Sequence, residues 1–328
     1  MLELGWYCPS EGDGRHLGTA APERPPTFDY LLRVVRAAER AGAGEVLVPT
    51  GRLNDSFAPD APFMESWTTA AALAARTSLI RILVAVNPAP ERVELIAHRA
   101  ATLWAVAPGR IAINLVAGGG PEDPYGAPSA DHDARYARLA ALADALRPGF
   151  PGPLYLGGAS PAARALAARV CDTYLMWGEP PDEIAARAEG MRAQAGRRLR
   201  VGLRIHLIAR RSDREAGEAA GELLSRAVVQ RARAGEYAIF DSHGQARMNA
   251  LTADGAGWLA PGLWAGIRVV RGGAGTALVG SYETVAGWLD RYREAGVDLV
   301  IGSGYPHLEE VGRVARRVWT RLRSPVAA

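Results

Sequence analysis

The sequence predicts a single (β/α)8 barrel, because short apolar runs alternate along the chain with longer segments of helical period. About eight such runs are present, which is the number of strands that closes a barrel of this kind. The length of 328 residues also fits, since one such domain commonly reaches roughly 250 residues or more. We therefore expect one TIM-barrel domain over residues 1–328.

The expected strands are Leu2–Cys8, Glu45–Pro49, Ile80–Val86, Ile111–Ala117, Pro153–Gly157, Thr173–Trp177, Val201–Ala209 and Asp298–Gly302. After the first of them, Thr27 has the side chain of a helix N-cap, and Gly42 and Gly44 are typical of a helix end. The helix between them has one apolar face, formed by Tyr30, Leu31, Val34, Val35 and Ala38. The last helix repeats this pattern with Leu308, Val311, Val314, Val318 and Leu322. Such faces are expected to pack against the outer wall of the barrel.

Two stretches interrupt the alternation and are expected to be insertions at the rim. Residues 53–66 follow the second strand, and residues 235–280 separate the seventh helix from the eighth and contain the run RGGAGTALVG. Loops that follow strands emerge at the C-terminal face of a barrel, where active sites lie. The glycine-rich run is not a dinucleotide fingerprint, because the required order of strand, tight turn and helix is missing. We expect a mobile substrate or flavin loop here, with a merely flexible connection as the alternative.

Composition excludes several classes of function. All 38 basic residues are Arg, so a catalytic Schiff-base lysine, a lysine-anchored pyridoxal phosphate, a Walker A loop and a kinase strand lysine are ruled out. Cys8 and Cys171 stand apart from any metal or disulfide motif and are expected to be buried apolar residues.

The charge pattern and the hydropathy give the expected surroundings of the protein. The net charge of +3 is spread over interspersed Arg and acidic residues, which does not favour nucleic acid as a partner. Neither a membrane span nor a signal peptide is evident, so we expect a cytoplasmic protein without a membrane partner.

Polar residues on two late strands indicate an anion pocket. In VGLRIHLIAR, the period of a strand puts Arg204 and His206 on one face and apolar residues on the other. Tyr305 and His307 follow the last strand and are expected at the same rim, with Arg271 added from the glycine-rich loop. Guanidinium groups bind the paired oxygens of a sulfonate, phosphate or carboxylate. The alternative for the strand is a structural Arg paired to an acid beside a core histidine.

A second feature indicates a phosphate site. The fifth strand ends as LYLGGAS, with Ser160 at the start of the next helix. Backbone N–H groups at a glycine-rich helix start bind phosphate, as a barrel that binds FMN would require. An ordinary N-cap after a glycine turn is the alternative.

Several motifs in order along the chain resemble the bacterial alkanesulfonate monooxygenases of the luciferase-like flavin monooxygenase superfamily. They are GDGRHLGT, VLVPTGR, AHRAATLW, PGRIAINLVAG, DHDARY, YLGGAS, YLMWGEPP, GLRIHLIAR, LWAGIRVVRGGAGTALVG and SGYPHLEE. The resemblance implies an enzyme that accepts reduced FMN from a separate NAD(P)H-dependent flavin reductase and uses O2 as co-substrate. In that family the C–S bond of a small anionic alkanesulfonate is cleaved to give an aldehyde and sulfite, and we expect a homodimer or homotetramer.

The resemblance also assigns roles to individual residues. Arg204 and Arg271 match positions that hold the anion and the flavin peroxide, His206 and His307 are polar pocket groups, and Tyr305 is a hydrogen-bond donor. These five residues are the expected catalytic set. Trp177 matches a pocket wall, and the FMN phosphate is assigned to Tyr136, Gly158 and Ser160.

Two departures from the family leave the substrate open. Asn54 stands near the place of a pocket cysteine and is expected to contact the substrate, and ADALRPGFPGPLYLGG joins the fourth helix to the fifth strand almost directly, where the family has an extended segment. The alternatives are hydroxylation, N-oxidation or Baeyer–Villiger oxidation of another metabolite, a deazaflavin-dependent oxidoreductase, and a barrel that has lost catalysis.

Overall fold

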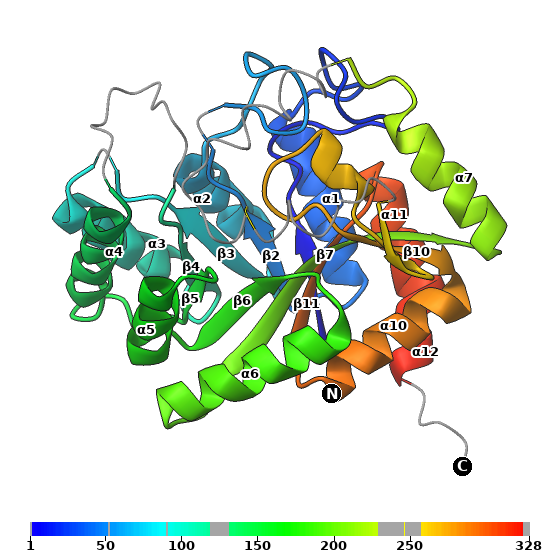
Figure 1. Cartoon of the computed structure of the whole chain (residues 1–328). Helices are drawn as coiled ribbons and strands as arrows, with labels where there is room; N and C mark the ends of the chain where they lie inside the picture. The colour runs from blue at the N-terminus through cyan, green and yellow to red at the C-terminus, as the bar shows by residue number, and fades with distance from the viewer. Residues whose placement is uncertain are drawn as a thin grey trace.

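Eight parallel strands close into a barrel in a computed structural model that describes residues 2–51, 53–89, 91–118, 131–228, 246 and 257–323 (Figure 1). The barrel strands are β1 (Glu3–Tyr7), β2 (Glu45–Val48), β3 (Arg81–Val86), β4 (Ile111–Leu115), β5 (Leu154–Gly157), β6 (Thr173–Trp177), β7 (Arg200–Arg210) and β11 (Leu299–Ser303). Closure comes from β11, which pairs in parallel with both β1 and β7. The predicted fold class is confirmed.

Helices form the outer layer around the strands (Figure 1). They are α1 (Phe28–Arg40), α2 (Ser66–Arg76), α3 (Val93–Val106), α4 (His132–Leu146), α5 (Pro161–Val170), α6 (Pro181–Ala195), α10 (Tyr282–Glu294) and α11 (His307–Val314), the last continued by η3 (Ala315–Trp319) and α12 (Thr320–Arg323). The hydroxyl of Thr27 accepts a hydrogen bond from the N–H of Tyr30, so the expected N-cap of α1 is present. The expected apolar face of α1 is buried against the barrel.

Strand β7 is longer than its neighbours and organises the insertion. Its first half pairs with β6 and its second half, from His206 to Arg210, pairs in parallel with β10 (Ala277–Ser281). Between β7 and β10 lie α7 (Asp213–Leu224), the short strands β8 (Trp258–Ala260) and β9 (Leu263–Trp264), and η2 (Gly266–Val269). The last part of the expected insertion, ALVGS, is therefore a strand. It pairs with the part of β7 that extends past the end of β6. Most of residues 229–256 lie outside the described residues.

The barrel interior is filled from its N-terminal end. Alternate strand residues form an inner apolar cluster that includes Tyr7, Leu83, Tyr155 and Ile301. Below them, the hydroxyl of Tyr155 donates to the buried carboxylate of Glu45, with 2.8 Å from Oη to Oε2. This packing leaves the C-terminal end of the interior for polar groups.

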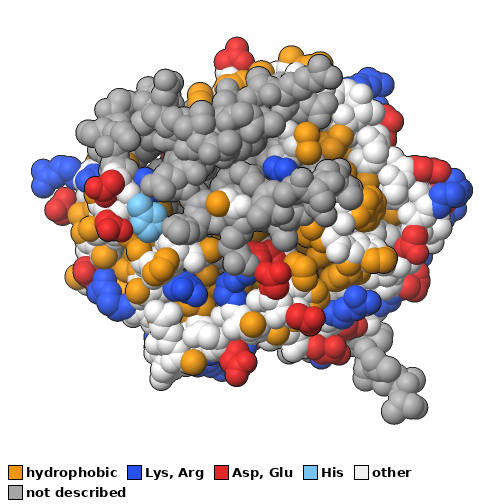
Figure 2. Space-filling model, viewed as in Figure 1, with side chains coloured by type: hydrophobic (Ala, Val, Ile, Leu, Met, Phe, Trp, Pro, Cys, Tyr) orange, Lys and Arg blue, Asp and Glu red, His pale blue; other side chains and the backbone are white. Residues whose placement is uncertain are grey.

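The surface shows no segregation of charge on the face seen in Figure 2, where Arg and acidic side chains are interspersed over the described surface. Within the described part of the chain, no helix is long and apolar enough to cross a membrane.

Candidate functional site

Arg204 and His206 project from β7 into the C-terminal half of the barrel, while Leu203, Ile205 and Leu207 pack outward as the strand period predicts. The ring of His206 is fully buried and held at both nitrogens. Its Nε2 donates to the carbonyl of Ala274 at 2.9 Å, so its Nδ1 accepts from the hydroxyl of Ser303 at 2.7 Å. Burial, followed by the charges of Arg204 and Arg271, holds the pKa of His206 well below its ordinary value. His206 is therefore neutral and fixed in one tautomer.

The guanidinium of Arg204 is buried and has no carboxylate partner among the residues that the structure describes. Its Cζ lies 4.5 Å from the centre of the Tyr7 ring, and Nη1 donates to the carbonyl of Ile205 at 3.1 Å. Its Nη2 has no hydrogen-bond partner among the described residues. Burial and the nearby Arg271 lower the pKa of Arg204 to about 10, so the group is charged at neutral pH. A buried, unpartnered donor is uncommon and indicates a place for a ligand atom.

The segment from Tyr305 to His307 completes this part of the site. The Tyr305 ring stacks on His206, with 5.6 Å between ring centres, and meets His307 edge-on at 5.1 Å. The Nδ1 of His307 is also buried without a hydrogen-bond partner among the described residues. Burial and Arg204 lower the pKa of His307 well below its ordinary value, which leaves it neutral. The structure thus brings Arg204, His206, Tyr305 and His307 together, as the sequence predicts.

Arg271 lies in the same cluster, but its charge is not free. Its Nη2 contacts the carboxylate of Glu11 at 3.1 Å and 3.3 Å, and both side chains are 7% exposed. Burial raises the pKa of Glu11, but the charge of Arg271 and the hydrogen bonds from Ser56, Arg271 and Tyr7 outweigh this effect. The net result is a lowered pKa, so the carboxyl is ionised. The expectation of a strongly cationic pocket is therefore corrected: Glu11 neutralises Arg271, and Arg204 is left as the single uncompensated cation among these residues. Sequence reasoning missed Glu11 because nothing links it to Arg271, 260 positions away.

Asp13 is a second residue that the sequence analysis did not single out. Its carboxylate accepts from the backbone N–H of His307 at 2.6 Å and of Gly14 at 2.8 Å, and from the hydroxyl of Tyr30. It therefore ties the loop after β1 to the start of α11. The turn GDG was visible in the sequence as part of a motif, but a turn aspartate gives no signal of a partner near the other end of the chain.

Asn54 is fully buried in the loop after β2. Its amide nitrogen donates to the carbonyls of Glu11 and Pro62, and its amide oxygen accepts from the N–H groups of Ser56 and Phe57. These contacts order the loop. Contact with a substrate stays a prediction that this geometry does not support.

Tyr136, Gly158 and Ser160 lie together at the start of α5. The Ser160 hydroxyl accepts from the N–H of Ala163 at 3.1 Å and is near enough to lower the pKa of the Tyr136 phenol, which burial raises. Gly158 has φ +131°, and a Cβ there would lie 2.7 Å from Ala163 Cβ and 3.0 Å from Tyr136 Oη. A side chain at position 158 would fill the space between Tyr136, Gly158 and Ser160, which we call the phosphate corner. On β6, Trp177 lies near Gly273 of the insertion, where an added Cβ would be 3.8 Å from the indole ring.

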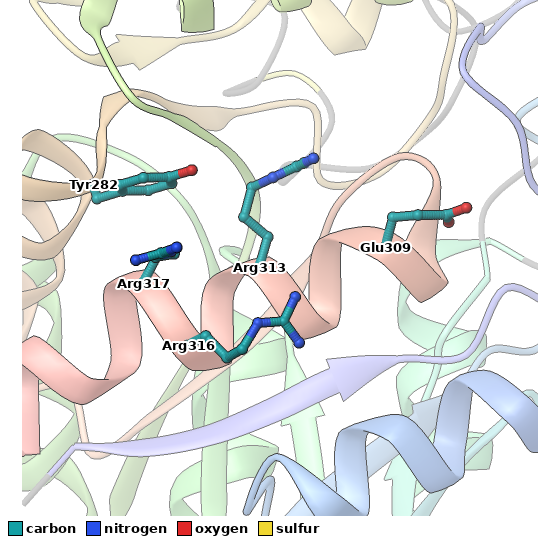
Figure 3. Close-up of a pocket in the computed structure, with 5 residues that line it drawn as sticks. All are labelled: Tyr282, Glu309, Arg313, Arg316 and Arg317. Carbon is teal, nitrogen blue, oxygen red and sulfur yellow. The ribbon is translucent and has the colours of Figure 1, made fainter.

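A surface concavity of about 360 Å³ lies elsewhere, on the outer helical layer (Figure 3). It is lined by Tyr282, Glu309, Arg313, Arg316 and Arg317. None of these residues belongs to the predicted site. Within the described part of the chain, no cluster of His, Cys, Asp or Glu could hold a metal ion.

Replacing Asp13 by Asn should flatten the pH dependence of stability. Burial raises the pKa of Asp13 from 3.8 to about 7, so between these values the folded protein keeps a proton that the unfolded chain releases. The stability contributed by this group is complete below the lower pKa and is lost as the pH rises through the upper one. Wild type should therefore lose stability as the pH rises from about 4 to about 7, and Asp13→Asn should not. The difference in unfolding free energy between the two proteins should change over this range by on the order of a few kcal/mol, in favour of the variant.

Urea unfolding at several pH values measures this difference, with Asp29→Asn in the exposed first turn of α1 as the control. A difference between Asp13→Asn and wild type that does not change with pH would contradict the assignment.

Solved structures of other proteins share this fold, and a protein-family model identifies the family. The family model described as luciferase-like monooxygenase matches residues 2–152 and 144–299. A riboflavin lyase solved with modified FMN and riboflavin superposes with a TM-score of 0.79 at 19% identity, over 98% of this chain and 91% of that chain. The EDTA monooxygenase from Chelativorans sp. BNC1 gives 0.76 at 16% identity, over 98% and 93%. An F420-dependent secondary alcohol dehydrogenase gives 0.68 at 16% identity, over 98% and 99%.

At these identities the solved structures show the fold alone, and the narrower resemblance to alkanesulfonate monooxygenases stays a prediction. The family model, in contrast, spans the strands and loops that carry Arg204, His206 and Arg271. The chain belongs to the luciferase-like monooxygenase family.

Proposed function

We propose that this protein is a monooxygenase that uses reduced FMN and O2 to oxidise a small organic substrate carrying one anionic group, with an alkanesulfonate as the first candidate. The observation that carries the proposal is the buried Nη2 of Arg204, a cationic donor without a hydrogen-bond partner among the described residues, in a cluster that also contains the unpartnered Nδ1 of His307. A charged donor in this position is suited to a ligand oxygen. A separate NAD(P)H-dependent flavin reductase is proposed as the source of the reduced flavin, and assembly as a homodimer or homotetramer remains part of the proposal.

The residues present fit a flavin. The corner formed by Tyr136, Gly158 and Ser160 would hold the phosphate, because it combines a hydroxyl, a phenol and a helix start that lacks an obstructing side chain. The unpartnered Nη2 of Arg204 and Nδ1 of His307 are the groups that would meet the substrate. Reduced FMN, when bound, supplies the two electrons needed for one oxygen atom of O2 to enter the substrate and the other to leave as water.

The protein side chains position the substrate and control protons. Arg204 would bind the anionic group, since its charge has no carboxylate partner among the described residues. His206 is fixed as a neutral donor to Ala274, so it holds the loop that carries Arg271 rather than exchanging protons. The neutral ring of His307 and the Tyr305 hydroxyl are the groups able to accept or donate a proton at the substrate. Burial of these rings limits the access of water.

A reductase-coupled assay tests the reaction directly. With a panel of alkanesulfonates we expect sulfite and aldehyde to form in equal amounts, and Arg204→Lys should lower product per reduced flavin by about tenfold or more, because an ammonium keeps the charge but loses the planar fork.

Arg200→Lys, at the other end of β7 and paired with Glu3, is the matched control and should behave like wild type. An oxygenated product without sulfite would keep the monooxygenase but replace the substrate class. Turnover only with a reduced deazaflavin and without use of O2 would overturn the proposal.

Ser160→Ala should weaken FMN binding by about 1 kcal/mol, the typical value of one hydrogen bond, because it removes a hydroxyl from the proposed phosphate corner. Ser160 also caps α5, so loss of a cap must be separated from loss of a ligand contact. Ser212→Ala removes an equivalent cap from α7, where the hydroxyl accepts from the N–H of Glu215 at 3.2 Å. Fluorescence titration of both variants with FMN should show weaker binding for Ser160→Ala alone. Equal affinities would reduce Ser160 to an ordinary N-cap.

A further inference from the structure

Three loops at the barrel mouth meet at the carboxylate of Glu11. Glu11 follows β1, Ser56 lies in the loop after β2, and Arg271 lies in the insertion after β7. The carboxylate accepts from Tyr7 Oη at 3.1 Å, from the hydroxyl of Ser56 and from Arg271 Nη2. Arg271 in turn donates from Nε to Ser56 Oγ at 3.0 Å and from Nη2 to Tyr7 Oη at 2.8 Å.

These contacts occupy Nε and Nη2 of Arg271, which form one of the edges by which a guanidinium binds an anion. A guanidinium binds a carboxylate or sulfonate by directing two N–H groups at its oxygens, and here Nη2 contacts both oxygens of Glu11 while Nε is used by Ser56. Asp55 adds a further favourable charge near Arg271. Glu11 therefore stands where the anionic group of a ligand would otherwise bind.

The ion pair between Glu11 and Arg271 lowers the net positive charge of the site. Counting only Arg204, Arg271, Glu11 and the two histidines, the arginines contribute two positive charges, Glu11 contributes one negative charge, and His206 and His307 are neutral; the charge of Asp55 acts on Arg271 in addition. One positive charge is left at the centre of the site, on Arg204. A dianionic group placed there would be attracted by Arg204 and repelled by Glu11, and buried charges are costly unless they are paired.

We propose that Glu11 is a specificity-determining residue: it takes the place of an anion at Arg271, so the site selects a substrate with one singly charged group and rejects a doubly charged one. This inference rests on the proposed function for its biological meaning, since it assumes that the substrate meets Arg204 in the barrel mouth. Its physical content, the neutralisation of Arg271 by an internal carboxylate, can be tested without turnover.

Methanesulfonate and sulfate are suitable probes, because they have similar tetrahedral heads and carry one and two negative charges. Their dissociation constants would be measured by calorimetry at constant ionic strength on the full-length protein. Glu11→Gln removes the charge and keeps the shape of the side chain, so sulfate should bind at least about tenfold more tightly than to wild type, with a smaller gain for methanesulfonate. Glu45→Gln, a buried carboxylate at the opposite end of the barrel, is the control and should change neither affinity.

A double variant, Glu11→Gln with Arg271→Gln, keeps the test valid if the single change unfolds the protein. Removing both partners of a buried ion pair is far less disruptive than removing one. If the pair is internally neutralised, the double variant should bind both probes within about twofold of wild type. The proposal is overturned if folded Glu11→Gln binds sulfate as wild type does, or if the double variant loses affinity tenfold, which would mean that Arg271 leaves Glu11 to bind the anion. Either result leaves the assay of monooxygenase activity unaffected, so the two proposals fail separately.

Discussion

The hydrogen bonding of β7 is the constraint on which the barrel and its site depend. Residues 202–206 pair with β11 and close the barrel, residues 200–204 pair with β6, and residues 206–210 pair with β10. This pairing fixes which face of β7 is inside, and therefore sends Arg204 and His206 into the mouth. It also anchors the insertion, because β10 follows directly after the loop that carries Arg271 and Ala274.

The site is organised by how its buried charges are compensated. Glu11 forms an ion pair with Arg271. The carboxyl group of Asp13 accepts hydrogen bonds from the N–H of His307, at the start of α11, and from the Tyr30 hydroxyl. Within the described part of the chain, Arg204 contacts only the carbonyl of Ile205 and the ring of Tyr7. The interior is closed at the other end by Tyr155 and Glu45, so ligand chemistry is confined to the C-terminal end. With His206 held at both nitrogens, the site offers one charged donor on Arg204 and one neutral ring nitrogen, that of His307, which can accept a proton.

Sequence reasoning located the strands because buried parallel strands are short apolar runs, and the expected bounds of all eight differ from the observed ones by at most two residues. It also placed Arg204 and His206 on one face, since that follows from the period of a strand. It did not give β10, because a glycine-rich run has weak strand propensity and its pairing depends on the free edge of β7. Glu11, Ser56 and Asp13 could not be found either. They lie on loops, and their partners are set by tertiary structure.

We propose that the mouth of this barrel binds reduced FMN, with its phosphate at Tyr136, Gly158 and Ser160, and that the unpartnered Nη2 of Arg204 binds the anionic group of the substrate. Anaerobic titration of the protein with reduced FMN, with oxidised FMN and a reduced deazaflavin titrated in parallel, tests this most directly. The account predicts tight binding of reduced FMN, weaker binding of oxidised FMN and a nearly colourless purified protein. Preferential binding of the deazaflavin, or no binding of reduced FMN by folded protein, would contradict it.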